Sequence, residues 1–305
     1  MTAALVPIVA WIAVLAVAPA VVGIATRTKS LLTGRRGAPI AQLYFDLAKL
    51  ARRGAVYSTT TTWMFRLAPC VTLATVVLAA TIAPLDGRAS LLRFSGDAIA
   101  FAYLLGLGRF LLVLAAMDTG SSFEGMGASR EVTFATVVEV GLFLSLAALS
   151  IATHDLSLTG MVGGDLAARW TGELPPLVMI AVSLFAMLLA ESSRVPVDDP
   201  ATHLELTMVH EVMVLDHSGP DLALILYASA LKMTVFGALI VGVLIPRAAL
   251  SPLISIAVLV AGLLAIGVAV GIVESAMARL RLPRVPLYIA GGSALALFSL
   301  ILLLR

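Results

Sequence analysis

Long apolar runs recur along the chain, and shorter polar segments separate them. Eight of these runs are about 20 residues long, near 3–25, 65–83, 99–117, 133–153, 174–190, 222–245, 253–275 and 285–304. A helical run of this length crosses a hydrocarbon core of about 30 Å, whereas a membrane β-barrel would show shorter segments of alternating hydrophobicity. The pattern predicts an all-α integral membrane protein with eight transmembrane helices, arranged as a single domain over residues 1–305.

The first long polar segment, at about residues 26–64, contains an amphipathic pattern. Its residues 41–53 place leucines on one side of a helix and charged side chains on the other, namely Leu43, Leu47 and Leu50 against Asp46, Lys49 and Arg53. A helix with one apolar and one charged side lies in the interface between lipid and water. We therefore expect one interfacial amphipathic helix in addition to the eight spans.

Basic residues are distributed unequally between the two ends of the expected bundle. With the N-terminus outside, thirteen of them fall in or beside the cytoplasmic loops and five fall on the outer side. Cytoplasmic loops of membrane proteins carry an excess of Lys and Arg. The chain is thus expected to be a multi-pass protein of the cell inner (plasma) membrane, with its N- and C-termini outside. The cytoplasmic loops are expected at about 26–64, 118–132, 191–221 and 276–284.

The most polar stretch of the chain, residues 191–219, lies between two apolar runs. It holds three of the four histidines and six of the eighteen acidic residues. It is either an ordinary wet loop or a polar site at the membrane boundary that handles protons or a charged partner. Residues 201–215 can form a helix carrying His203 and His210, whose separation of seven residues is wider than usual for a metal-binding pair. No metal site is predicted, and a single cysteine, Cys70, cannot ligate an iron–sulfur cluster.

Ionisable residues inside the apolar runs are the candidates for chemistry. Glu139 lies among apolar neighbours in the fourth run, and Arg109 and Lys232 lie inside the third and sixth. A carboxylate in such surroundings is either protonated or paired, because burial disfavours its charged form. Glu139 is therefore expected either to form an ion pair with Arg109 or Lys232 that packs the helices, or to transfer protons. Glu191 closes the next run on the same expected side of the membrane.

Three stretches carry a resemblance to a known family. They are Gly34-Arg35-Arg36-Gly37 with Gln42, Asp46 and Lys49; Gly127 and Arg130 followed by Glu139; and Glu191, Arg194, Pro196 and Asp198 followed by Glu205 and Ser218-Gly219. Together they resemble the membrane-anchor subunit shared by respiratory complex I and energy-converting membrane-bound NiFe-hydrogenases. Residues 202–211 are similar to the formate hydrogenlyase branch, whereas complex I members carry acids at the positions of Ala201 and His203.

The resemblance implies a non-catalytic membrane subunit of a multisubunit respiratory or hydrogenase-type redox complex. Such a subunit docks the soluble electron-transfer arm and couples redox chemistry to translocation of protons or Na+. The implied proton path comprises Glu139, Glu191, Glu205, Glu211 and Lys232. The residues implied to dock partners or to line a cavity are Arg35, Arg36, Gln42, Asp46, Lys49, Arg130, Arg194, Asp198, Asp199, His203 and His210.

The same resemblance implies the partners. These are soluble hydrogenase-like large and small (iron–sulfur) subunits on the cytoplasmic face, antiporter-like membrane subunits and the lipid bilayer, with no nucleic acid. NiFe and iron–sulfur centres are expected in the partner subunits and not in this chain. Two other functions stay open: a quinone-binding subunit of a complex I-type NADH dehydrogenase, and a stand-alone secondary transporter. The transporter would show inverted repeats, and the two halves of this chain do not visibly mirror each other.

Overall fold

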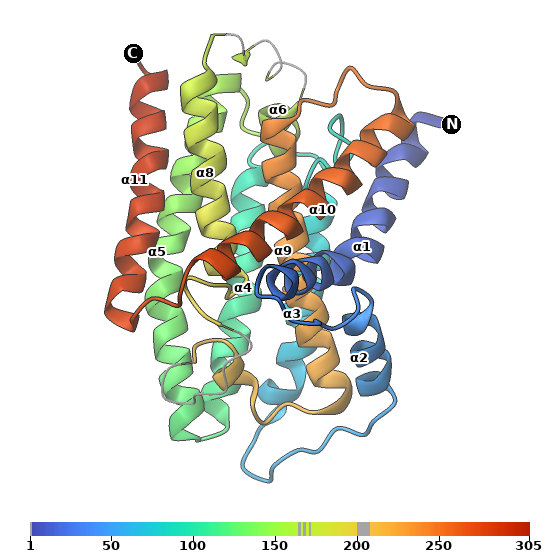
Figure 1. Ribbon diagram of the computed structural model, residues 1–305, viewed down its shortest axis with the longest axis vertical. Helices are drawn as coiled ribbons and strands as arrows, with labels where there is room; N and C mark the ends of the chain where they lie inside the picture. Colours follow the sequence, from blue (N-terminus) through green and yellow to red (C-terminus); the bar gives the residue numbers. More distant parts are fainter. Residues whose placement is uncertain (1, 164–165, 167–168, 171, 200–207) are drawn as a thin grey trace.

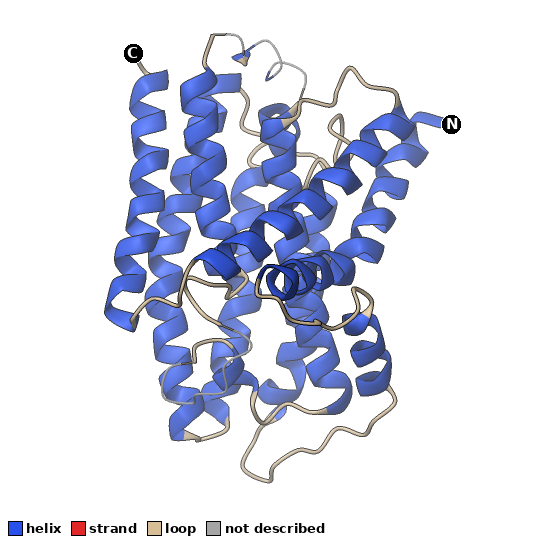
Figure 2. Cartoon of the chain, in the orientation of Figure 1, coloured by secondary structure: helices blue, strands red, loops and turns tan. Residues whose placement is uncertain are grey.

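The computed structural model describes residues 2–163, 166, 169–170, 172–199 and 208–305. Within these ranges the chain is helical and contains no strand (Figure 2). Eight of the described helices are long and apolar enough to cross a membrane, which confirms the predicted fold class. They are α1 (Thr2–Leu32), α3 (Trp63–Ile82), α4 (Asp97–Asp118), α5 (Ser122–Thr153), α8 (Leu174–Glu191), α9 (Gly219–Leu244), α10 (Pro252–Ala276) and α11 (Val285–Leu303). The shorter helices are α2 (Gln42–Ala51), α6 (Leu158–Val162) and the 3-10 helices η1 (Glu211–Val214) and η2 (Leu282–Arg284).

Proline marks the start of the last four spans. It occupies one of the first two positions of α8, α9, α10 and α11. An N–H at this position has no partner within the helix, so its loss costs no helical hydrogen bond. These starts therefore follow directly from the sequence.

Three predictions of local structure were wrong. The first span continues as α1 to Leu32, into the loop expected at 26–64. Most of the loop expected at 118–132 is the beginning of α5, which starts at Ser122. The first turns of α5 bury Glu124 and Gly127 against protein rather than against lipid, so they lack an apolar run. In the described part of 201–215, only η1 is helical, because the segment turns along the bundle end instead of continuing as a helix.

The spans form a bundle around α9, which packs against α1, α3, α8 and α10. α9 is also the most enclosed span, with 72% of its apolar window buried. On one side α5, α8 and α11 pack together, and on the other α1 and α10 cross with inclined axes (Figure 1). Both termini lie at the same end of the bundle, and α2 lies toward the opposite end (Figure 1). That opposite end carries the polar segments and is called the loop side below.

The predicted amphipathic helix is α2. It packs against α1 and α9, and the Tyr44 hydroxyl donates a hydrogen bond to the Ala16 carbonyl of α1. None of its residues is fully buried, and Phe45 is 62% exposed. An exposed aromatic side chain beside charged residues is typical of a helix lying at the membrane surface.

Glycines bring α10 against α1. A Cβ on Gly271 would lie 2.5 Å from the Ala25 carbonyl oxygen, and one on Gly267 would lie 2.8 Å from that of Val21. Small residues at such positions let the backbones of membrane helices approach closely. The crossing places the loop-side ends of both helices together, where they carry Lys29 and Glu274.

Candidate functional site

Arg109 of α4 is the centre of a group of charged side chains inside the bundle. Its guanidinium lies 2.5 Å from Glu191 Oε1, 3.4 Å from Glu139 Oε1 and 3.9 Å from Glu131 Oε1. Lys232 Nζ of α9 lies 3.2 Å from the second oxygen of Glu191. These five residues, from α4, α5, α8 and α9, are called the charge cluster below.

The members of the charge cluster differ in exposure. The side chains of Arg109, Glu191 and Lys232 are 8%, 4% and 13% exposed, whereas that of Glu139 is 45% exposed. An isolated charge inside a membrane bundle carries a large desolvation free energy, and a close ion pair offsets part of it. The cluster contains two cations and three carboxylates, so complete ionisation would leave one uncompensated negative charge.

The end of α8 fixes the positions of Glu191 and Arg194. Ser193 adopts a φ of 50°, and the Arg194 amide donates to the Leu189 carbonyl at 2.9 Å, as in a Schellman cap. Glu191 is the last helical residue and points to Arg109 and Lys232. The turn directs Arg194 to α10, where its Nη1 lies 3.2 Å from Glu274 Oε1.

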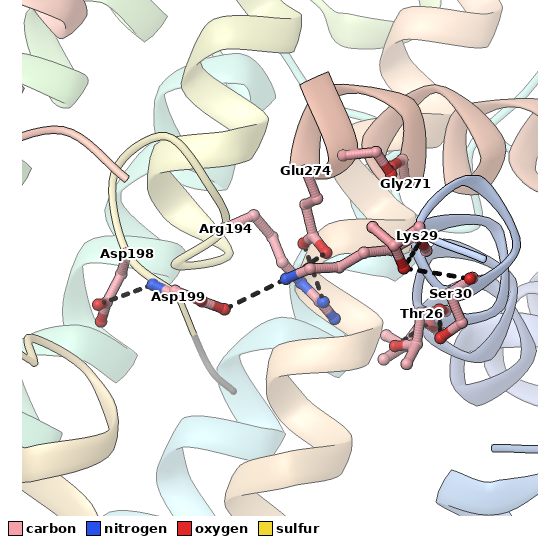
Figure 3. Close-up of polar contacts among 11 residues, drawn as sticks. Thr26, Lys29, Ser30, Arg194, Asp198, Asp199, Gly271 and Glu274 are labelled. Atoms are coloured by element: carbon pink, nitrogen blue, oxygen red, sulfur yellow. Dashed lines mark hydrogen bonds and ion pairs between the residues drawn. The ribbon is translucent and has the colours of Figure 1, made fainter. Parts of the chain in front are cut away.

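A second ion-pair network ties α1, α10 and the segment after α8 together at the loop side (Figure 3). Lys29 Nζ lies 3.3 Å from Asp199 Oδ1 and 3.6 Å from Glu274 Oε2. Glu274 thus joins Lys29 to Arg194, which places a helix-end carboxylate between two cations from different elements (Figure 3).

Asp198 anchors the segment that leads into η1. Its Oδ1 lies 2.9 Å from Arg279 Nη2, and its Oδ2 accepts hydrogen bonds from the backbone amides of Val209 and His210 at 3.0 and 3.2 Å. Arg130 supports the same segment, because its Nη1 donates to the Met208 carbonyl at 2.9 Å. These contacts hold His210 beside the charge cluster.

Four cavities adjoin these groups, and the smallest of them, about 10 Å³, lies beside Arg109, Glu131 and Glu191. The loop-side cavity, of about 320 Å³, is lined by Val22, Thr26, Leu43, Ser192, Ser193, Arg194, His210, Glu211, Val214, Ile225, Leu226, Ser229 and Ala230. The inner cavity, of about 30 Å³, is lined by Thr72, Val76, Leu105, Gly108, Arg109, Leu112, Glu131, His210, Ile225, Ala228, Ser229 and Lys232. A space of that size holds one or two water molecules. The flank groove, of about 220 Å³, is lined by Gly106, Arg109, Phe110, Val113, Val132, Ala135, Thr136 and Glu139.

The half-buried His210 and the buried His217 are both shifted toward the neutral form. Burial, followed by the positive charge of Lys232, lowers the pKa of His210 to about 4. Burial also lowers the pKa of His217 to about 4. The His217 ring stacks on Phe65 with the ring centroids 3.9 Å apart.

The structure brings together part of the predicted proton path. Glu139, Glu191 and Lys232 lie in the charge cluster. Glu139 contacts Arg109, which is one of the two ion pairs expected for it. Glu211 lines the loop-side cavity. Glu205 and His203 lie outside the described residues.

The residues expected to dock partners or to line a cavity differ in exposure. Arg35, Arg36 and Lys49 are exposed, whereas Arg194 and Asp198 are buried within the ion pairs described above. Gln42 and Asp46 are half-buried and bond to each other at 3.0 Å. The exposed residues suit a docking role, and the buried ones shape the loop side of the bundle.

Glu131 was missed by the sequence analysis. It lies next to Arg130 in a stretch that was interpreted as loop. Its separation of eight residues from Glu139 places both carboxylates toward the same side of α5, which only becomes visible when the helix start at Ser122 is recognised.

Several known proteins are similar to this chain in sequence or in fold. Residues 4–304 match the family model described as NADH dehydrogenase. The chain is 30% identical to formate hydrogenlyase subunit 4 of Escherichia coli (strain K12) over 310 residues, covering 98% of both chains. It is 34% identical to hydrogenase-4 component C of the same organism over 228 residues, which cover 75% of this chain and 71% of the relative.

A solved structure supports the fold independently. It is one chain of the membrane-bound sulfane sulfur reductase, an archaeal respiratory membrane complex. The alignment covers 99% of the present chain and 100% of that chain, with a TM-score of 0.83 and 20% sequence identity. At that identity the match concerns the fold alone. The family model and the relatives confirm the resemblance expected from the three sequence stretches: the chain belongs to the NADH dehydrogenase family.

Proposed function

We propose that this chain is a non-catalytic membrane subunit of a multisubunit redox complex of the hydrogenase and formate hydrogenlyase type. It docks the soluble electron-transfer arm on its loop side and translocates protons through the charge cluster. The observation that carries the proposal is the cluster itself, in which three carboxylates contact two cations inside a membrane bundle. Its named relatives support the type of complex.

The charge imbalance of the cluster supports proton translocation rather than packing alone. A purely structural group would be most stable with equal numbers of cations and anions, because each uncompensated charge adds a cost of desolvation. Here one proton can move among Glu131, Glu139 and Glu191 without changing the total charge. A change of charge at a docked redox centre would shift this proton from one carboxylate to another.

Glu139 marks the expected exit of the path toward a membrane partner. Its carboxylate is 45% exposed and lies in the flank groove between α4 and α5. A carboxylate that faced lipid there would be strongly disfavoured. An antiporter-like membrane subunit that covers the groove and offers polar groups removes this cost and receives the proton.

The loop side is the expected docking face for the soluble arm. The exposed side chains of Arg35, Arg36 and Lys49 provide positive charge there. We place the NiFe and iron–sulfur centres in the docked partners, because this chain has a single cysteine. The excess of basic residues on this side favours an inner-membrane orientation with both termini outside.

The experiment that tests the proposal is Glu139→Gln in the assembled complex. Glutamine keeps the size and hydrogen-bonding capacity but cannot ionise, so proton translocation per electron transferred in membrane vesicles is expected to fall at least about tenfold. Because Glu139 is partly exposed and Arg109 keeps Glu191, the yield of the complex is expected to be unchanged. Reduced yield with normal translocation would contradict the proposal and leave Glu139 as a packing residue. Glu173→Gln is the matched control. Glu173 also forms an ion pair, with Arg169 at 2.9 Å, but it does not belong to the charge cluster.

Quinone binding is a second candidate function. The loop-side cavity of about 320 Å³, between α1, α2 and α9, is near the lower limit of small-molecule sites. A photoreactive short-chain quinone analogue should then label the purified complex, and Ala230→Trp, which fills the cavity, should abolish labelling. Equal labelling of the variant would exclude this cavity as the quinone site.

A further inference from the structure

Three residues separate the loop-side cavity from the inner cavity. His210, Ile225 and Ser229 line both spaces, and the two linings share no other residue. We call these three residues the neck. On one side of the neck the lining includes Arg194 and Glu211, and on the other it includes Lys232 and Glu131. The neck thus lies between the loop-side cavity and the part of the inner cavity that is lined by the charge cluster.

The backbone contacts of His210 hold its side chain at the neck. The His210 amide donates to Asp198 Oδ2, and Asp198 is itself bound by Arg279. His210 directly precedes η1, whose Val212 and Met213 are fully buried. The charged groups that act on the imidazole are Lys232, Asp198, Glu191 and Arg109. The backbone at His210 is therefore anchored beside the neck, and its imidazole lines both cavities.

The chemistry of the neck side chains suits proton transfer. Because its pKa is about 4, the imidazole of His210 is neutral at pH 7. One nitrogen of a neutral imidazole then donates a hydrogen bond while the other accepts. The Ser229 hydroxyl likewise donates and accepts, whereas the third member of the neck, Ile225, is apolar.

We propose that His210, assisted by Ser229, relays protons between the loop-side cavity and the charge cluster. The proposal rests on the proton-translocating function above and adds the residue through which protons enter the cluster. In each transfer the bare nitrogen takes a proton from a hydronium ion that has entered the loop-side cavity, which leaves a neutral water molecule there. The other nitrogen gives its proton to water in the inner cavity, and that water passes a proton on to Glu131 or Glu191. Rotation of the ring restores the starting tautomer, so charge and protons balance.

His217 provides a matched comparison. It lies seven residues after His210, is buried, and also has a pKa of about 4. Its ring stacks on Phe65 and lines neither of the two cavities. Burial and low basicity alone therefore do not distinguish His210; its place in the neck does.

The test compares His210→Gln, His210→Glu and His217→Gln in the assembled complex. We measure protons translocated per electron transferred in membrane vesicles, together with the yield of the complex. Gln cannot carry a proton, so translocation is expected to fall at least about tenfold. Glu can carry one, so it is expected to retain most of the translocation. His217→Gln is expected to behave as the unmodified protein.

A merely structural role predicts the opposite order. In that case the neutral Gln preserves translocation and yield better than the charged Glu, and this result would overturn the relay. Normal translocation by His210→Gln together with a defect in Glu139→Gln would also overturn it, while the function of the charge cluster would stand. Normal translocation by Glu139→Gln would instead reject the proposed function itself.

Ser229→Ala tests the relay even if the complex does not assemble with a substitution at His210. Alanine fits the helix α9 and removes only the hydroxyl at the neck. If neither His210 variant assembles, reduced translocation by Ser229→Ala supports the relay, and a normal rate overturns it.

Discussion

Arg109 determines how the acids around it share charge. Its guanidinium contacts Glu131 and Glu139 of α5 and Glu191 of α8, so one cation serves three carboxylates. Lys232 adds a second positive charge but contacts only Glu191. Glu191 is therefore the acid of the cluster that contacts both cations.

The half-buried His210 and the buried His217 make the stability of the fold depend on pH. Their pKa values are about 4 in the folded protein, below the ordinary value of 6.5. Between these values the unfolded chain binds more protons than the folded chain, so stability falls as the pH is lowered through this window. Above about pH 7 these residues cause no further change.

Thermal unfolding of the purified protein between pH 7 and pH 5 measures this effect. The midpoint is expected to fall with pH, and His217→Gln is expected to reduce the slope because one of the two groups is gone. His154→Asn is the control, because His154 is exposed and its positive φ of 55° suits asparagine. An identical slope in His217→Gln and the unmodified protein would contradict the assignment.

At the scale of helices, the spans could be predicted because an apolar run is a local property. The start of α5 could not, because Glu124 and Gly127 are buried against other parts of the protein. The meeting of Arg109, Glu191 and Lys232 was also beyond prediction. The sequence shows that each charge needs a partner, but the choice of partner depends on which helices pack together. The cavities follow from the same long-range packing.

The crossing of α1 and α10 links helix packing to the loop-side ion pairs. A methyl group on Gly271 would meet the Ala25 carbonyl at 2.5 Å and Thr28 Cβ at 2.6 Å. Gly271→Ala is therefore expected to push α10 away from α1 and to separate Glu274 from Lys29, at a cost of about 1–3 kcal/mol. A lower midpoint of thermal unfolding measures this cost.

Gly291→Ala on α11 is the matched control for that variant. A Cβ at Gly291 meets no atom within 4 Å, and alanine favours the helix, so its midpoint is expected to be unchanged or raised. Equal midpoints for the two variants would mean that the close approach of α10 to α1 does not support the fold.

At the scale of the whole molecule, the two ends of the bundle differ in chemistry. One end carries both termini, and the other carries α2 and the ion pairs around Glu274 (Figures 1 and 3). Arg35 and Arg36 are exposed on the loop side, whereas Arg194 forms a buried ion pair with Glu274. Only the exposed arginines are free to attract an acidic surface on a soluble partner. Such attraction weakens at high salt, because exposed charges are screened over about 10 Å at 0.1 M ionic strength.

Reversing these charges tests the docking face. Arg35→Glu combined with Arg36→Glu is expected to release the soluble hydrogenase-like subunits, since like charges then face each other across the interface. The membrane subunit itself is expected to insert normally, because both side chains lie outside the packed bundle. Co-purification from membranes, with mass-spectrometric identification of the soluble subunits, measures the effect. Arg305→Glu is the control, because Arg305 is exposed at the opposite end. Retention of the soluble subunits by the double variant, at the level of the control, would move the dock to another part of the loop side.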